Sequence, residues 1–134
     1  MTSVLIVGFG YVGRAYAQRV IANGDHVFAI GRSGDCDVEK VEYIQSDVAH
    51  VTKEHIHMEL DQVVFLVSPD RRDESAYHHV YQEGLANLIQ VLQETSPNLR
   101  SFILASSTGI YDQKDASWVD ETTPLLLTSY RSQM

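Results

Sequence analysis

Short apolar runs alternate along the chain with segments of helical periodicity. The first run, residues 3–7, is rich in β-branched side chains, as expected for a strand that is buried on both faces. Such alternation predicts a parallel sheet whose strands are joined by crossover helices. We expect the strands at residues 3–7, 27–30, 41–44, 63–67 and 101–105.

Two of the intervening segments have the pattern of amphipathic helices. In residues 11–23 we expect Val12, Tyr16 and Val20 to share the buried face, and Asn23 and Gly24 to end the helix. The longest helix is expected at residues 73–94, where the apolar positions follow a spacing of three and four. Its predicted stripe consists of Tyr77, Val80, Tyr81, Gly84, Leu85, Leu88, Ile89 and Leu92.

The rest of the chain has no helical or strand periodicity. Residues 31–40 are rich in Gly, Ser and Asp and predict a loop, and residues 112–129 predict a second, irregular one. We therefore expect a single α/β domain over residues 1–134, a Rossmann-type doubly wound, mostly parallel sheet of five strands with helices on both faces. Such sheets ordinarily continue further, so residues 111–134 are expected to be a loop and the start of a catalytic helix in a truncated fold.

A glycine-rich loop joins the first predicted strand to the first helix. Its residues Gly8, Gly10 and Gly13 form the pattern G-x-G-x-x-G. Gly8 permits a tight turn, Gly10 leaves room for a pyrophosphate, and Gly13 allows the helix to pack closely on the strand. Free N–H groups at the helix N-terminus attract phosphate, so the loop predicts a dinucleotide site. The alternative is a plain strand–turn–helix with glycines at these positions by chance.

The end of the second strand bears on the choice of dinucleotide. NAD sites usually have an acidic residue there, which binds the ribose 2′-hydroxyl, whereas this chain has Arg32 and Ser33. An arginine suits the 2′-phosphate of NADP, so the sequence favours NADP over NAD. Asp35 and Asp37 would repel that phosphate if they folded back. The alternative reading of Arg32 is a solvated loop cation.

Polar side chains also follow the third and fifth strands. Asp47 could accept a hydrogen bond from an adenine amino group, or it could cap a turn or helix. Ser107 follows the fifth strand, and Tyr130 lies at the start of the next predicted helix. A hydroxyl at a strand end and a tyrosine on the following helix could form an acid–base pair. Such a tyrosine needs a nearby cation to lower its pKa, and the residue four positions on is Met134. Turn chemistry at Ser107 and packing at Tyr130 are the alternatives.

Composition excludes several classes of partner. The net charge of −8 argues against nucleic acid and anionic membranes, and no apolar run is long enough to span a bilayer. The chain starts directly in the first strand and has one cysteine, Cys36, so we expect no signal peptide, no internal disulfide and a cytoplasmic location.

Three further groups of residues are of a type that could form a binding site. His55 and His57, like His78 and His79, lack additional ligands at metal spacing, so we expect no metal site. Arg71 and Arg72 read better as a solvated helix entry than as an anion site. Trp118 could cover the cofactor or pack on the sheet.

Four segments together resemble the extended or atypical short-chain dehydrogenases, the NAD-dependent epimerase/dehydratase group. They read VLIVGFGYVGRAYAQRV, QSDV, YQEGLANLIQVL and FILASSTGIYD followed by WVDETTP. The last is the most specific, and the resemblance covers the front half of a family member. The glycine pattern, with Val7 where the extended branch has its first glycine, resembles the atypical branch.

The resemblance implies roles for individual residues. Ser107 matches the active-site Ser/Thr, Tyr130 falls near the catalytic tyrosine, and Met134 stands in place of its lysine. Asp47 matches the adenine-contacting aspartate, and Ser68 lies where the nicotinamide ribose is bound. The cofactor-binding set is then Gly8, Gly10, Tyr11, Val12, Gly13, Arg32, Ser33, Asp47, Val48 and Ser68.

Three functions are compatible with these observations. The first is an NAD(P)-binding oxidoreductase or sugar-nucleotide epimerase/dehydratase-like protein that acts by hydride transfer on an unidentified small molecule. The second is a non-catalytic NAD(P)-binding or redox-sensing module, suggested by Met134. The third, disfavoured by the Ser106–Tyr111 signature, is the N-terminal domain of an unrelated dehydrogenase. We also expect the fifth strand to be an apolar sheet edge that promotes homo-oligomers.

Overall fold

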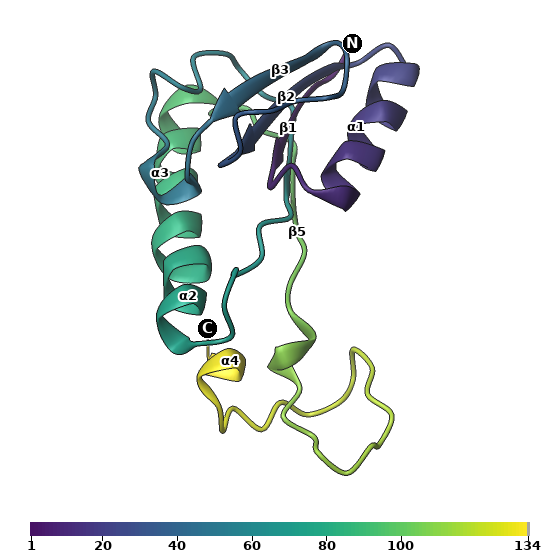
Figure 1. The fold of residues 1–134 in the computed structure, drawn as a ribbon, viewed down its shortest axis with the longest axis vertical. Helices are drawn as coiled ribbons and strands as arrows, with labels where there is room; N and C mark the ends of the chain where they lie inside the picture. Colours follow the sequence, from purple (N-terminus) through teal and green to yellow (C-terminus); the bar gives the residue numbers. More distant parts are fainter. Residues whose placement is uncertain (134) are drawn as a thin grey trace.

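The computed structural model describes residues 1–133 and contains one parallel sheet (Figure 1). Its strands are β1 (Ser3–Val7), β2 (His26–Gly31), β3 (Val41–Gln45), β4 (Gln62–Phe65) and β5 (Ser101–Leu104). They lie in the order β3-β2-β1-β4-β5, and every neighbouring pair is parallel. The order reverses between β1 and β4, so the predicted Rossmann-type topology with five strands is confirmed.

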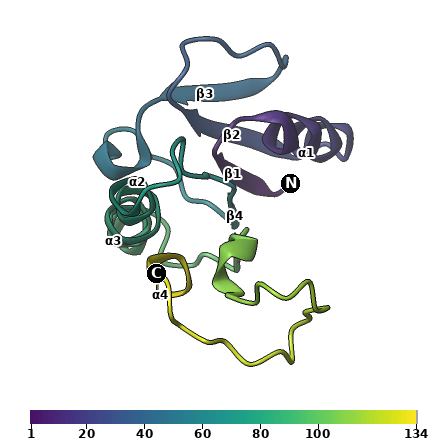
Figure 2. The same cartoon turned by 60° about the horizontal axis from the view of Figure 1, so that its bottom comes forward.

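Helices cover both faces of the sheet (Figures 1 and 2). One face carries α1 (Tyr11–Ala22), and the other carries a continuous helical segment made of α2 (Glu74–His78), the π-helical η2 (His79–Gly84) and α3 (Leu85–Thr95). Three short elements lie beyond strand ends: η1 (Val48–His50), η3 (Thr108–Ile110) and α4 (Tyr130–Gln133). Within residues 1–133, no helix combines the length and apolar character needed to cross a membrane.

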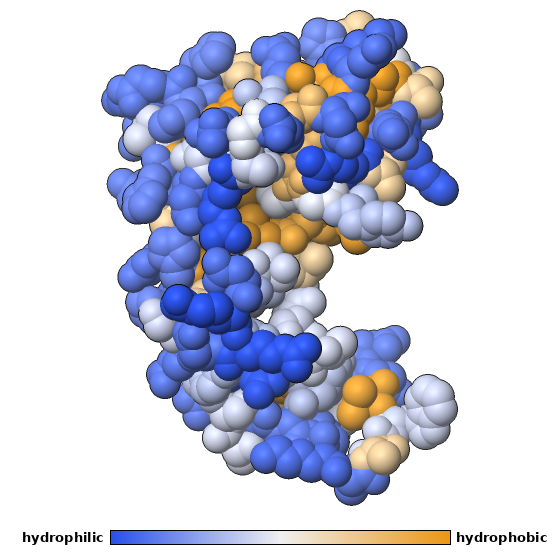
Figure 3. All heavy atoms as spheres, in the orientation of Figure 1, coloured by the Kyte–Doolittle hydropathy of each residue, from blue (hydrophilic) through white to orange (hydrophobic). Residues whose placement is uncertain are grey.

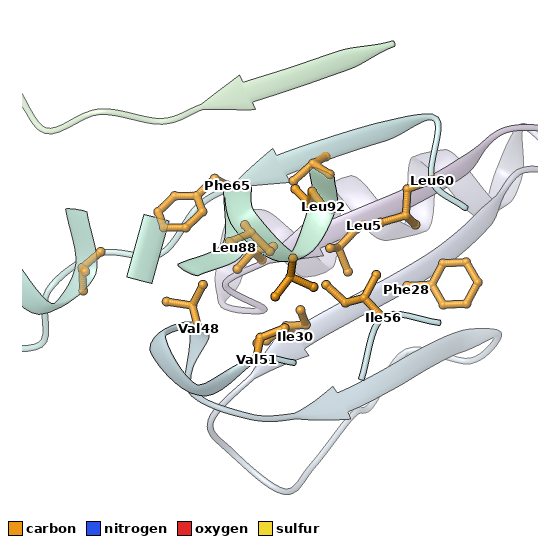
Figure 4. Packing of buried hydrophobic residues seen from close by; sticks show 14 residues of the cluster. Leu5, Phe28, Ile30, Val48, Val51, Ile56, Leu60, Phe65, Leu88 and Leu92 are labelled. Atoms are coloured by element: carbon orange, nitrogen blue, oxygen red, sulfur yellow. The ribbon is translucent and has the colours of Figure 1, made fainter. Parts of the chain in front are cut away.

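The central strand β1 separates two hydrophobic cores. Its alternating side chains point to opposite faces, so Leu5 and Val7 join one core while Val4 and Ile6 join the other. The larger core lies under α3 and also takes in the segment from η1 to Leu60 (Figure 4). Full burial of one such Leu or Ile side chain contributes about 1.5–3 kcal/mol. The carboxyl end of β1 is therefore held on both sides.

The buried face of α1 differs from the expected one. Gly13, Ala17 and Val20 are buried, whereas Val12 is 59% exposed. A Cβ on Gly13 would lie 2.6 Å from the Gly8 carbonyl oxygen, so this glycine sets how closely the helix approaches the turn. Because Gly13 faces the turn, Val12 points away from the sheet. Hydrophobic periodicity alone does not reveal this orientation. The predicted stripe of the longest helix holds except at Ile89, which is 43% exposed.

The segment after β5 is irregular, as predicted, and is held by one carboxylate. Asp112 accepts hydrogen bonds from the backbone N–H groups of Thr128 and Ser129 and from the hydroxyls of Thr128, Ser129 and Ser132. These donors, led by Ser132, hold the pKa of Asp112 far below its usual range. The helix predicted to start at Tyr130 is thus present as α4. The hydrogen bond from Ser132 ties it to Asp112, 20 residues earlier in the chain.

Two features of the surface bear on earlier expectations. Strand β5 is the sheet edge, and its side chains Ile103 and Leu104 are 47% and 44% exposed. Self-association through this edge stays a prediction. Trp118 is fully exposed, so it neither covers a cleft nor packs on the sheet.

Candidate functional site

A cleft of about 820 Å³ lies at the carboxyl edge of the sheet, where the loops after β1, β2, β3 and β4 meet. This volume is in the range of pockets that enclose a cofactor. On the face drawn in Figure 3 the molecule is hollowed between the sheet and the C-terminal segment. The cleft lies at the topological switch point, the usual ligand position in open α/β sheets.

The glycine loop forms the floor of the cleft. Gly8 has a φ of +97°, and a Cβ there would lie 2.7 Å from the Val67 backbone nitrogen, so only glycine fits. Its N–H donates to the Ile30 carbonyl at 2.9 Å, which ties the loop to β2. Gly10, by contrast, has no atom beyond its own and those of its two chain neighbours within 4 Å of the position that a Cβ would occupy. The loop is therefore closed against the protein at Gly8 and open toward the cleft at Gly10.

The N-terminus of α1 points at this open space. Gly10 is its N-cap residue and makes no side-chain capping bond. The first turn also contains no acidic side chain. The N–H groups of the first turn and the positive end of the helix dipole thus lack a protein anion in this turn, which suits a bound phosphate.

An ion pair that the sequence did not reveal lies beside the loop. Arg14 Nε donates to Asp37 Oδ1 at 2.6 Å, and the guanidinium lies 5.1 Å from the Phe9 ring centre and also donates to the Phe9 carbonyl. The Arg14 hydrogen bond lowers the pKa of Asp37. Asp37 is therefore engaged by α1, which weakens the repulsion that this carboxylate would exert on a 2′-phosphate.

The Arg32 side chain lies at the mouth of the cleft. Its Nη1 is 3.1 Å from Asp70 Oδ2, and this hydrogen bond lowers the pKa of Asp70. The backbone around Arg32 is fixed, because Gln45 Nε2 donates to the Arg32 carbonyl and the Tyr43 hydroxyl donates to the Ser33 carbonyl at 2.6 Å. The Arg32 side chain is thus half exposed, whereas the backbone that carries it is held in place.

Asp47 combines a capping role with a place in the cleft wall. Its Oδ1 accepts from the Ala49 N–H at 2.9 Å, so it caps η1, the structural alternative considered above. Both carboxylate oxygens lie 3.1 Å from His79 Nε2. Burial opposes ionisation, but the Ala49 N–H and the His79 ring outweigh it and lower the pKa of Asp47. The carboxylate is therefore kept charged beside the cleft.

The two candidate catalytic residues do not line the cleft. The Ser107 Oγ accepts from the Gly109 N–H at 3.0 Å and caps η3. The Tyr130 hydroxyl donates to the Arg72 carbonyl at 2.5 Å, and its ring packs edge-on against Tyr77 at 5.6 Å. Both alternatives considered for them, turn chemistry and packing, are thus present in the structure. Met134 lies outside the described residues.

All ten residues expected to bind the cofactor line this one cleft: Gly8, Gly10, Tyr11, Val12, Gly13, Arg32, Ser33, Asp47, Val48 and Ser68. The sequence missed Asp70, Ser75, His78, His79 and Glu83, which also line it. The sequence signal for these residues was weak, because polar side chains in the first turns of a helix are typical of any solvent-exposed surface. Arg71 lines the mouth while paired with Asp73 at 3.0 Å. Among residues 1–133, no three His, Cys, Asp or Glu side chains are arranged so that they could hold a metal ion.

Comparisons with known proteins agree with this geometry. A family model described as "NAD dependent epimerase/dehydratase family" matches residues 4–132. A solved structure from Methylobacillus flagellatus, described as an NAD-dependent epimerase/dehydratase, is 28% identical with a TM-score of 0.76 and covers 98% of this chain and 46% of its own. None of the curated proteins matches the chain.

Two more distant structures share the fold. The Bordetella bronchiseptica enzyme WbmH, solved with NAD⁺, is 19% identical with a TM-score of 0.78 over 99% of this chain and 48% of its own. A UDP-N-acetylglucosamine 4-epimerase from Methanobrevibacter ruminantium M1, solved with UDP-N-acetylmuramic acid, is 17% identical with a TM-score of 0.78 over 98% of this chain and 46% of its own. The chain thus spans about half the length of these structures.

Proposed function

Because this chain belongs to the NAD dependent epimerase/dehydratase family, we propose that it binds NAD(P) in the cleft at the carboxyl edge of the sheet. The pyrophosphate lies over Gly10, against the N-terminus of α1. The observation that carries the proposal is the contrast between two glycines of one loop. Gly8 is packed against the Val67 backbone, whereas a Cβ on Gly10 would have no atom within 4 Å apart from those of Gly10 and its two chain neighbours.

The adenosine half extends toward the ends of β2 and β3. Asp47 accepts a hydrogen bond from the adenine amino group, and Val48 supplies an apolar wall beside it. Arg32 and Ser33 lie where the ribose 2′ position falls, and Arg32 favours the phosphate of NADP. The nicotinamide half extends toward Ser68, beyond β4. The NAD⁺ complex of WbmH supports a dinucleotide in this fold.

The proposed chemistry is hydride transfer of the epimerase/dehydratase type on a small molecule, with a sugar nucleotide as the favoured class. A bound nicotinamide would accept and return the hydride. In the family assignment Ser107 orients the reacting hydroxyl or carbonyl, and Tyr130 moves its proton. For that step the Tyr130 hydroxyl must leave the Arg72 carbonyl, to which it donates here. The UDP-N-acetylglucosamine 4-epimerase among the similar structures supports the substrate class.

A second candidate function is a non-catalytic dinucleotide-binding module. The contacts of the two candidate catalytic residues favour it, because Ser107 caps η3 and Tyr130 is bonded to the backbone. Neither side chain lines the cleft. On this alternative the cofactor site is unchanged, and only the chemistry differs.

Calorimetric titration with NADPH and NADH tests cofactor binding. The wild type should bind at sub-millimolar concentration, and Arg32→Ala should weaken NADPH selectively. Arg100→Ala is the matched control, because Arg100 pairs with Asp61 at the opposite end of the sheet and is absent from the cleft lining. No binding of either nucleotide would refute the site.

Conversion of a UDP-sugar by the nucleotide-bound chain separates the two functions. It is followed by chromatography of the sugar products, because the nicotinamide is regenerated in each turnover. The first predicts turnover that Tyr130→Phe abolishes. The second predicts binding without turnover, which Tyr130→Phe leaves unchanged.

A further inference from the structure

His79 lies between two carboxylates at the adenine side of the cleft. Its Nε2 is 3.1 Å from both oxygens of Asp47, and its Nδ1 is 3.0 Å from Glu83 Oε2. A neutral imidazole has one N–H and would turn a lone pair toward one of these carboxylates. Only the protonated ring donates to both. The arrangement therefore favours a charged His79.

The helix around His79 is shaped to fit the segment that carries Asp47. The π-helical η2 begins at His79 and ends at Gly84, and π-helical turns are often found at functional sites. A Cβ on Gly84 would lie 2.5 Å from Val48 Cγ1, so the missing side chain makes room for η1. One turn later, Asn87 Nδ2 donates to the carbonyls of Val48 and Val51 at 2.9 and 2.8 Å. Three successive contacts thus hold residues 47–51 against the helix.

We propose that His79 is a positioning residue which, when protonated, holds Asp47 in the orientation that binds adenine, so that dinucleotide affinity falls as the pH rises. This inference rests on the proposed cofactor site. Asn87 and Gly84 fix the backbone of η1, whereas His79 contacts the carboxylate that reaches the ligand. Loss of the charge leaves one ring N–H, for which Asp47 and Glu83 compete. In the tautomer that donates to Glu83, the Ala49 N–H remains as the donor to Asp47.

The described titratable groups around His79 are Asp47, Glu83, His78 and His50. Asp47 and then Glu83 raise the pKa of His79, against a smaller opposing effect of burial. His78 shares Glu83, with its Nδ1 at 3.4 Å from Oε1, and the His50 ring lies 6.3 Å away and edge-on. The carboxylates dominate, so the charge on His79 persists above the pH at which a free histidine loses it. Binding is then intact near neutrality and weakens in alkaline solution.

Fluorescence titration with NADH from about pH 6 to about pH 9 tests the proposal across the histidine range. The wild-type dissociation constant should rise roughly fivefold to tenfold, the effect of losing one hydrogen bond. His79→Gln keeps one amide donor toward Asp47 and should bind with a flat pH profile. His79→Leu should bind weakly throughout. His57→Gln removes an exposed histidine outside the cleft and should titrate like the wild type.

Nicotinamide mononucleotide, which lacks adenine, serves as the second probe. Its binding should not depend on pH or on residue 79. If wild-type NADH binding is independent of pH, or if His79→Gln keeps the wild-type profile, the positioning role is wrong while the cofactor site stands. If the wild type binds no NADH at any pH, the proposed function itself fails. Should His79→Leu not fold, the wild-type and His79→Gln profiles decide.

Discussion

Arg32 at the end of β2 and Asp70 beyond β4 form an ion pair, with Nη1 and Oδ2 3.1 Å apart across the mouth of the cleft. Their side chains are 59% and 57% exposed, so solvent screens the pair and it contributes little stability. The pair bears on cofactor binding, because Asp70 and a 2′-phosphate would compete for Arg32. A 2′-phosphate would offer Arg32 a partner of higher charge, and Asp70 would then repel that phosphate.

The first prediction concerns this competition. Asp70→Asn should tighten NADPH binding about threefold, the effect of removing one screened opposing charge, and should leave NADH binding unchanged. Arg32→Ala should weaken NADPH about tenfold or more, because a charge-assisted bond to phosphate is lost. Calorimetric titration measures both. Asp115→Asn, which changes a carboxylate that is absent from the cleft lining, is the control. Equal effects on NADH and NADPH would show that Arg32 does not contact a 2′-phosphate.

The second prediction separates the roles of two glycines. Gly8→Ala should lower the free energy of unfolding by about 2–4 kcal/mol, because φ is +97° and the Val67 backbone cannot move aside. Gly10→Ala should change it by no more than about 1 kcal/mol, the effect of Ala at a helix N-cap, since its φ of −90° is ordinary and a new Cβ would meet no atom beyond those of its chain neighbours. Urea denaturation measures both.

Dinucleotide titration completes that comparison. Gly10→Val should fold and yet lose most of its NAD(P) affinity, because the side chain occupies the space proposed for the pyrophosphate. A folded Gly10→Val that binds like the wild type would move the pyrophosphate elsewhere.

The third prediction concerns the close approach of Gly84 to Val48. Gly84→Ala should destabilise the fold by about 1–3 kcal/mol, because the new Cβ would meet Val48 Cγ1 at 2.5 Å. Val48→Ala in the same chain should recover part of this loss, which thermal unfolding of the single and double variants measures. Additive effects would mean that the two positions do not contact each other. The helical preference for Ala over Gly works in the opposite direction by about 1 kcal/mol.

The fourth prediction concerns Asp112 and acid. Its pKa is strongly lowered, first by Ser132 and then by Ser129, so the stabilising effect of its charge is present at pH values above the ordinary pKa. It is lost as the pH falls through the lowered value, which places release of α4 in strongly acidic solution. Asp112→Asn should release the segment already at neutral pH.

Limited trypsin digestion detects this release, because Lys114 and Arg131 lie in the segment. Asp112→Asn should be cut at these sites faster than the wild type. Asp115→Asn, whose carboxylate bonds only Ser117 nearby, should be cut at the wild-type rate. Equal rates for Asp112→Asn and the wild type would mean that other contacts hold α4.

Local patterns in the sequence are enough for the fold and for the position of the cleft. Buried strands, helix periodicity and the loop from Gly8 to Gly13 each depend on residues that are close in the chain, so they were readable directly. Since parallel strands end at one sheet edge, residues after different strands were expected to meet, and Arg32, Asp47 and Ser68 do line one cleft. The strand boundaries differed from expectation by only one or two residues.

Only the tertiary structure decided which charges pair. Asp37, which would repel a 2′-phosphate only if it folded back, is bound by Arg14. Arg32 is bound by Asp70, and His79 is bound by Asp47. Each pair joins residues from separate loops or helices, and its geometry depends on the sheet order and on the close approaches permitted at Gly13 and Gly84. Sequence periodicity specifies which face of an element is buried, but contacts between polar side chains depend on positions in space that no local pattern encodes.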